Sequence, residues 1–427
     1  MLPAIQPSRR SLLQLAIAAG LSFVVPGLSV RAAALRGSER PKSMITLWLS
    51  GGASQLETWD PHPGTSIGGP THAIRTSIPE VEIADSFPQM AEQLSRLSVI
   101  RSLVSKEGDH DRATYLVKSG YRPDPTLQHP SVAAIVAHAL PNHQLEIPPV
   151  FSLGYSNHPS RGGFLGGQYN ALRIHDPGTR HQDYSELLAE PRQQQRFRNL
   201  DVLAQAFRKH REIVVDRTMH EANIETAVKM MSSEQLRALE SADEPESLRM
   251  AYGDSDFGRG CLVARRLVEQ GVRAVEVTLQ NFDSHAQNFT THRQLADVLD
   301  PAFATLLQDL TQHDLLKSTV VLCLSEFGRT PRINGADGRD HWPQGFSCLV
   351  GGGGLRPGVL IGATDSKGED EKPSDPIQIA DLHATILKVL GIDPAVEFPT
   401  SIGRPIRYSD GKPIERLLPS RKDEPVG

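Results

Sequence analysis

Residues 319–330 read TVVLCLSEFGRT, an unbroken run of six apolar or β-branched residues followed by polar and ionisable ones. An apolar run without alternation is typical of a strand that is covered on both faces. The residues from Ser325 to Thr330 would then follow the carboxyl end of a buried strand, where open parallel sheets place their chemistry. This segment therefore predicts an α/β fold with a buried parallel sheet and a functional site at one edge of that sheet.

Similar apolar runs alternate with helical patterns along the rest of the chain. The expected strands are 44–49, 97–103, 150–153, 274–279, 319–324 and 346–350. The expected helices are 87–96, 132–139, 187–209, 221–240, 257–269, 293–316 and 379–390. Apolar strands with helices between them indicate a largely parallel sheet with helices on both faces, which is a three-layer sandwich.

Composition excludes several classes of protein. The chain has 427 residues, of which 39% are hydrophobic, so it can bury a sizeable core and is not disordered as a whole. Its net charge of −5 argues against a nucleic-acid partner held by bulk positive charge. With only three cysteines, Cys261, Cys323 and Cys348, the chain has neither a disulfide framework nor a four-cysteine zinc site.

The first 34 residues have the pattern of an export signal. Arg9 and Arg10 precede a moderately apolar run from Leu15 to Val25, and three alanines at 32–34 offer a cleavage site. This is the twin-arginine pattern, and the run is shorter than the roughly 20 residues that a membrane span requires. A short membrane anchor or a chance pair of arginines are the alternatives. We expect export through the twin-arginine pathway to the periplasm or beyond, with no transmembrane span once the signal is removed.

The remaining chain is expected to form one large domain, from residue 43 to residue 407. The segment from about 170 to 260 is poorer in strands and richer in charge, which indicates a helical insertion. Residues 408–427 are polar and are expected to be a peripheral tail.

Ionisable side chains follow four of the expected strands. They are Asp60 after the first strand, His110 after the second, Asp283 and His285 after 274–279, and Glu326, Asp340 and His341 after 319–324. Carboxylate and imidazole groups are ligands for zinc, manganese, calcium or a similar divalent ion. We therefore expect a metal site at the edge where these strands end.

Each of these residues also has a structural interpretation. An isolated Asp-X-His sequence is usually structural or solvated, and Asp340 with His341 could be a hydrogen-bonded pair within a loop. His110 could be an ordinary buried histidine. Arg329 could hold an anion through its guanidinium or form a surface salt bridge. The glycine-rich segment 161–166, RGGFLG, could face a substrate or be a simple turn.

Several of these segments resemble the conserved blocks of the "domain of unknown function 1501" family. The matching blocks are LSGGAS at 49–54, TWDP at 58–61, DSHAQNF at 283–289, SEFGRTP at 325–331 and GRDHWP at 338–343. The family in turn resembles the alkaline phosphatase and sulfatase superfamily. The resemblance implies an alkaline-phosphatase-like sandwich, a bound divalent metal, and an anionic ester or sulfated glycan as substrate.

The resemblance also implies roles for individual residues. Segment 108–112, GDHDR, falls where sulfatases carry their nucleophile, and Glu326 falls where they carry an acidic metal ligand. The chain departs from that pattern because His110 stands where a hydroxyl or thiol is usual, and Gly51-Gly52 replaces the acidic ligand after the first strand. Attack by a metal-activated water, or a histidine nucleophile, would then be needed.

Two main functions follow from these observations. The first is an exported metal-dependent hydrolase of phosphate or sulfate esters, in which His110 and Arg329 are catalytic. Its expected metal ligands are Asp60, Asp283, His285, Glu326, Asp340 and His341. The second is a non-catalytic protein of the same fold that binds a glycan or an envelope partner, which the missing hydroxyl nucleophile favours. A structural envelope protein is a weaker third alternative.

Overall fold

The computed structural model describes residues 42–179, 233–400 and 403–419, with a few isolated positions between 195 and 230. The expected twin-arginine signal and most of the helices expected at 187–209 and 221–240 lie outside these residues. Within them, the 3-10 turn Glu234–Leu239 is followed by helix α9, Glu246–Tyr252. The helical insertion therefore stays a prediction.

The core of the fold is a nine-stranded sheet. Its strand order is β12-β4-β11-β8-β1-β7-β5-β6, and β13 also pairs with β4. The strands are β1 (Ser43–Leu49), β4 (Leu97–Val104), β5 (Val150–Leu153), β6 (Leu172–Ile174), β7 (Ala274–Leu279), β8 (Thr319–Leu324), β11 (Phe346–Gly352), β12 (Leu360–Ile361) and β13 (Ile377–Gln378). All pairs are parallel except those of β11, which is antiparallel to both β4 and β8. The expected largely parallel sheet is confirmed.

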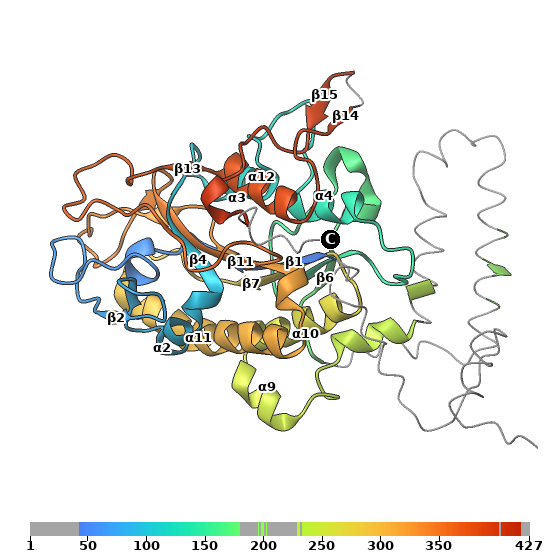
Figure 1. The fold of residues 1–427 in the computed structure, drawn as a ribbon, viewed down its shortest axis with the longest axis horizontal. Coiled ribbons are helices and arrows are strands. Elements are labelled where there is room, and N and C mark those ends of the chain that lie inside the picture. Colours follow the sequence, from blue (N-terminus) through green and yellow to red (C-terminus); the bar gives the residue numbers. More distant parts are fainter. Residues whose placement is uncertain are drawn as a thin grey trace, which may run out of the picture. The chain divides into compact units, whose positions relative to one another are not determined.

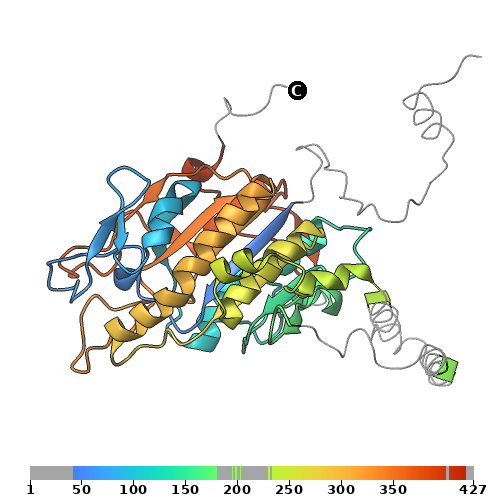
Figure 2. The ribbon, with the colours of Figure 1, turned by 90° about the horizontal axis from the view of Figure 1, so that it is seen from below.

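Helices cover both faces of this sheet, as expected for a three-layer sandwich (Figure 1). On one face lie α2 (Pro88–Gln93), α9, α10 (Asp256–Glu269) and α11 (Asn288–Gln312). On the other face lie α3 (His110–Ser119), α4 (Val132–Ala139) and α12 (Ile379–Val389). Figure 2 shows the first face, where the yellow α10 and the orange α11 cross the strands side by side.

Alternation along each strand divides the core in two. In β1, Ile45 and Leu47 pack with α10 and α11, whereas Met44 and Trp48 pack with α4 and α12. Because both sets are buried, the strand shows no polar face, which is why it is uniformly apolar in sequence. Leu417 is also fully buried in the second core, so packed chain continues past residue 407.

A buried charged cluster ties the two long helices together. Arg265 of α10 is 1% exposed and donates from Nε to Asp309 Oδ2 of α11 at 2.9 Å. Its other nitrogens lie 2.7 Å from Glu244 and 2.9 Å from Glu269, and the Tyr252 hydroxyl donates to the same Asp309 oxygen at 2.8 Å. We call these five residues the Arg265 cluster. One guanidinium faces three carboxylates here, and Arg266, 2.5 Å from Glu244, adds a second cation.

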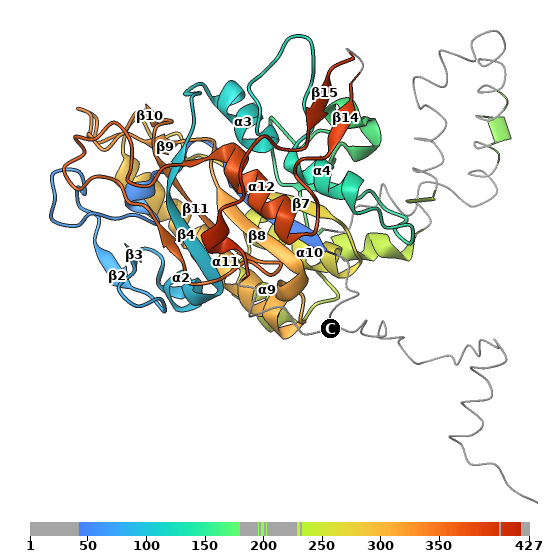
Figure 3. The same ribbon diagram turned by 45° about the horizontal axis from the view of Figure 1, so that its top comes forward.

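Three small antiparallel pairs complete the described structure. They are β2 (Ala73–Arg75) with β3 (Glu82–Ala84), β9 (Gly328–Arg329) with β10 (His341–Trp342), and β14 (Glu397–Pro399) with β15 (Pro405–Arg407). Figure 3 shows β9 and β10 at the same edge of the sheet as the start of α3. In the described residues no helix is both long enough and apolar enough to cross a bilayer.

Candidate metal centre

The candidate site lies where three adjacent strands end. β8, β1 and β7 are neighbours and parallel, so their carboxyl ends open onto one edge. Asp283 follows β7, Glu326 follows β8, and the β9–β10 pair places His341 opposite Arg329 in register. Residues far apart in the sequence are brought together because β7 and β8 flank the same strand, β1.

Asp283 is the centre of this site. His285 Nε2 lies 3.2 Å and His341 Nε2 3.3 Å from its Oδ1 atom, and His110 Nε2 lies 3.4 Å from its Oδ2 atom. We call these four residues the imidazole cluster. Among the described residues, His110, Asp283 and His341 each offer a ligand atom within 4.8 Å of the others, as a metal ion would require. The cluster unites four of the residues that the sequence singled out.

Each histidine of the cluster bonds to an oxygen acceptor through its other nitrogen, Nδ1. The acceptors of His110, His285 and His341 are, in that order, Glu326 Oε1 at 2.8 Å, Asp340 Oδ1 at 3.0 Å and the Gly108 carbonyl at 2.7 Å. A ring that donates its Nδ1 proton presents an unprotonated Nε2 when neutral. The same arrangement, with an acceptor behind each imidazole, orients metal-binding histidines in general.

The resulting geometry fits a divalent cation. His285 Nε2 and His341 Nε2 lie only 3.0 Å apart, and with both lone pairs directed at each other and at a carboxylate, they need a cation or a proton between them. Tetrahedral ligands at 2.0–2.2 Å from one ion lie about 3.4 Å from each other. The separations of 3.2–3.4 Å around Asp283 are close to that value. The imidazole and carboxylate donors suit zinc or manganese better than calcium.

Charges around the site keep Asp283 ionised. Although partial burial opposes its ionisation, the Arg329 guanidinium, His110 and His341 lower the pKa of Asp283 to about 2. The hydrogen bond to Glu326 raises the pKa of His110 above its ordinary value, whereas burial lowers the pKa of His341. Without a bound ion the two imidazoles therefore differ in their affinity for a proton, a pattern typical of acid–base sites.

Arg329 takes a different position from the one expected of an anion clamp. Its side chain is fully buried, and it donates to the Gly51, Gly52, Phe282 and Arg339 carbonyls and to Asp283 at 2.6 Å. These contacts orient Asp283 and close the loops around it. These contacts favour a role for Arg329 in positioning Asp283. That Arg329 also touches a substrate stays a prediction.

Two of the expected acidic ligands lie behind the cluster and one lies elsewhere. Glu326 and Asp340 contact histidines, as described above, and Glu326 also accepts from the Gly51 amide at 2.8 Å. Asp60 pairs instead with Arg101 at 3.3 Å and accepts from the Thr364 amide at 2.7 Å. Its described contacts are therefore with residues outside the imidazole cluster.

The glycines that follow β1 are explained by close packing. Gly51 has φ +114°, and a Cβ atom there would lie 2.5 Å from the Asp283 amide nitrogen. A larger residue, including the acidic one that the resemblance leads one to expect, would push Asp283 out of place. Gly51 thus forms a turn that lets two loops meet.

Sequence analysis missed the start of α3. The segment 108–112 looked like a loop, but Asp109 accepts from the Arg112 amide at 3.1 Å and caps a helix that begins at His110. An aspartate three residues before a helical amide is a recognisable N-cap signal. The role of the Gly108 carbonyl has no side-chain signal and could not be found from the sequence.

A model of the family described as "Protein of unknown function (DUF1501)" matches residues 41–418. The sequence matches none of the curated proteins compared with it.

Solved structures with a similar arrangement include the lipoteichoic acid synthase of Listeria monocytogenes, at 9% identity and TM-score 0.39, covering 87% of this chain and 76% of that one. A sulfatase from Pseudoalteromonas sp. has 10% identity and TM-score 0.38, over 83% and 68% of the two chains. The TAB5 alkaline phosphatase, in a mutant form with magnesium bound, has 12% identity and TM-score 0.39, over 83% and 99%.

Proposed function

The chain belongs to the DUF1501 family of proteins of unknown function, and from that premise we propose that it is a metal-dependent hydrolase of phosphate or sulfate esters. One observation carries the proposal: three imidazole Nε2 atoms converge on the Asp283 carboxylate while each Nδ1 is held by an acceptor. We further propose, from the sequence pattern alone, that the protein acts outside the cytoplasm after twin-arginine export.

Asp283, His285 and His341 would hold the cation, because both Nε2 atoms lie beside the same Asp283 oxygen, Oδ1, whereas His110 faces the other oxygen, Oδ2. Three protein ligands leave a position open for substrate, which is the usual arrangement of a catalytic zinc site. A bound divalent ion would polarise the ester oxygen and lower the pKa of water. Asp340 would orient His285 and Glu326 would orient His110, each through the Nδ1 atom of the ring. Outer carboxylates commonly have this role.

His110 would hold and transfer the proton. Its Nδ1 is bonded to Glu326, which fixes the ring, and its Nε2 faces Asp283 at 3.4 Å. The pKa of His110 is raised by Glu326, so the ring can serve as a proton donor or acceptor near neutral pH. The phenylalanine ring of Phe327, 4.9 Å from the His110 ring, limits the access of water from that side.

The test combines elemental analysis with turnover, on protein purified without chelator. We expect one or two metal equivalents in the unaltered chain and none in Asp283→Ala/His341→Ala. His110→Ala should keep its metal and lose turnover of a panel of phosphate and sulfate esters, by about 10²–10⁴-fold for a general acid–base residue.

Three outcomes would change the proposal. No metal in either protein would overturn it. Loss of metal in His110→Ala would make His110 a ligand. Stoichiometric metal without turnover on any ester would instead support a non-catalytic protein that binds a glycan or an envelope partner, an alternative favoured by the absence of a hydroxyl or thiol between Gly108 and Arg112.

A further inference from the structure

A separate pocket opens along the same helix that begins at His110. Its volume is about 250 Å³, slightly below the roughly 300–1,000 Å³ of typical ligand pockets. Asp111, Thr114, Tyr115 and Lys118 line it from α3, at the spacing that places residues on one face of a helix. The first of these residues, Asp111, directly follows His110 of the imidazole cluster in the chain, and the pocket has room for about one sugar-sized ring.

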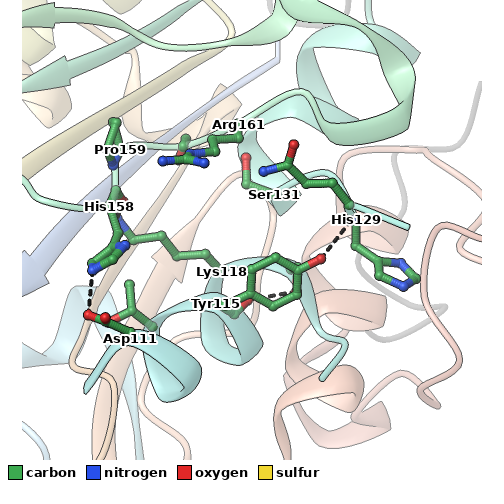
Figure 4. A pocket seen from close by; sticks show the side chains of 12 residues that line it. Asp111, Tyr115, Lys118, His129, Ser131, His158, Pro159 and Arg161 are labelled. Carbon is green, nitrogen blue, oxygen red and sulfur yellow. Dashed lines mark hydrogen bonds and ion pairs between the residues drawn. The ribbon is translucent and has the colours of Figure 1, made fainter. Parts of the chain in front are cut away.

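Segments 128–131 and 158–161 form the remaining walls. In Figure 4, Arg161 and Ser131 lie on the wall opposite Asp111 and Tyr115. The Ser131 amide donates to the Arg161 carbonyl at 2.9 Å, and the Phe164 amide donates to the Gln128 carbonyl at 2.9 Å. The two segments are thus bonded to each other and form one continuous wall.

Glycine makes this wall possible. Gly163 has φ +52°, and a Cβ atom there would lie 2.5 Å from the Gln128 carbonyl oxygen. The RGGFLG segment therefore needs its glycines to lie against the 128–131 segment, and this close approach holds the backbone of Arg161 at the pocket.

The walls are largely apolar, and two hydroxyls on them have a proton to donate. The Tyr115 hydroxyl accepts from the His129 amide at 2.7 Å, and the Ser131 hydroxyl accepts from the Ala134 amide at 3.2 Å. Each hydroxyl therefore has its acceptor capacity partly used and keeps its own proton. No described residue accepts that proton from either one. A ligand rich in oxygen acceptors fits such walls.

The pocket is lined by two cationic side chains, Lys118 and Arg161, and by one carboxylate, the exposed Asp111. Lys118 lies 2.7 Å from the buried carboxylate of Glu276, and Asp111 lies 2.8 Å from His158 Nε2. Arg161 is exposed, and no carboxylate of the described chain contacts its guanidinium. A guanidinium of this kind matches the oxygens of a sulfate, phosphate or carboxylate group.

We propose that this pocket binds the alcohol part of the ester, and that it selects a sugar-sized ring carrying a second anionic group, which Arg161 binds. The proposal rests on the proposed function in one respect only: the cleaved ester is taken to lie at the imidazole cluster, next to the start of α3. It adds to that function a binding site and a preference for substrates with two anionic groups.

Calorimetric titration of the full chain with two probes tests the preference. The probes are glucose 6-sulfate and glucose 3,6-disulfate, which differ by one anionic group. We expect the disulfate to bind about 10-fold more tightly, as charge-assisted hydrogen bonds of one guanidinium allow. Arg161→Gln should bind both probes equally, and Arg161→Lys should keep part of the preference. Arg249→Gln, an exposed arginine of α9 on the opposite face of the sheet, serves as the matched control.

Equal binding of the two probes by the unaltered chain would overturn the pocket proposal. So would an equal loss of preference in Arg161→Gln and Arg249→Gln, because attraction by net charge alone would then explain it. A chain without metal or turnover that still prefers the disulfate through Arg161 would overturn the proposed function and support the pocket. Ester turnover without an Arg161-dependent preference would have the reverse meaning.

Discussion

The imidazole cluster and the Arg265 cluster are both dense in ionisable side chains, yet they differ in how donors and acceptors are matched. In the Arg265 cluster each described oxygen that meets the guanidinium belongs to a carboxylate, and Tyr252 donates to Asp309. In the imidazole cluster the Nε2 atoms face a carboxylate and one another while their protons are directed away. In the imidazole cluster acceptors therefore face one another, whereas in the Arg265 cluster acceptors face donors.

This difference shows what separates a structural charge cluster from a candidate site. A count of ionisable residues alone would not distinguish the two regions. In the Arg265 cluster each carboxylate already has a cationic partner. Converging lone pairs are incomplete without a cation, and their exposure supports the same distinction, because Asp283 and His285 are about half exposed whereas Arg265 and Asp309 are buried.

The largest effect we expect is on stability, from Arg265→Met. Removing the cation leaves Asp309, 2% exposed, without its guanidinium, and breaking a buried pair in this way costs about 3–5 kcal/mol in the free energy of unfolding. Chemical denaturation followed by circular dichroism measures the loss. Metal content should not change. A variant that folds normally but binds no metal would break the comparison, since the two clusters would then be coupled.

Arg249→Met is the control for that measurement. Arg249 is exposed on α9, so its replacement should change the unfolding free energy by less than about 0.5 kcal/mol. An equal loss in both variants would show that the Arg265 cluster has no special role.

A buried histidine outside both clusters gives the next effect. His383 donates from Nε2 to the Val117 carbonyl at 2.9 Å, and burial lowers its pKa to about 4. Because the unfolded chain binds this proton more readily, stability should fall as the pH decreases from 6.5 to 4, by roughly 3 kcal/mol for a shift of this size.

His383→Gln should remove this part of the acid sensitivity while leaving the response to chelator unchanged. Unfolding free energies of both proteins at pH 7 and pH 4.5 measure it. The comparison would be weakened if the unaltered chain and the variant lost the same stability in acid, because a buried histidine without a metal would then have no signature of its own.

The smallest effect concerns a carboxylate behind the imidazole cluster. Glu326→Gln keeps the shape of the side chain but removes the charge that orients His110. Because His110 is the proposed proton carrier, we expect turnover to fall about 10–100-fold, as for other outer carboxylates, while metal affinity changes less. Competition with a fluorescent zinc chelator and ester turnover measure the two quantities separately.

Glu107→Gln is the matched control for Glu326→Gln. Glu107 is also buried, but its carboxylate pairs with Arg112 and Arg122 and orients no histidine. It should keep its turnover and its metal affinity. If both variants lose turnover to the same extent, the loss reflects a general disturbance near the site.

Much of the fold could be predicted because its strands are buried on both faces. The runs at 274–279 and 319–324, the first apolar except for Glu276 and Thr278, were predicted with the bounds that the structure shows. The start of α3 was not, because its signal is a single capping aspartate and no apolar periodicity precedes it. Periodicity reports burial, and helix ends depend on individual hydrogen bonds.

The candidate site could be predicted only as a set of residues. From the expected strand ends, Asp283, His285 and His341 were correctly predicted to be neighbours, because the ends of parallel strands lie at one edge of the sheet. Asp60 was expected there as well, yet it pairs with Arg101, because a loop of ten residues after β1 carries it away from the strand end. Buried contacts of Arg329 with four carbonyls depend on tertiary packing, which leaves no pattern in the sequence.

The placement of β1 between β7 and β8 also has a kinetic consequence. Met44 pairs with Ala274 on one side and Val320 on the other, so the central strand meets partners that are synthesised more than 200 residues later. Such a high contact order makes folding slow, because long loops must close before these pairs form. The first strand would stay unpaired and apolar until β7, about two thirds of the way along the chain, has been synthesised, and its exposed apolar surface makes it a segment for a chaperone to shield.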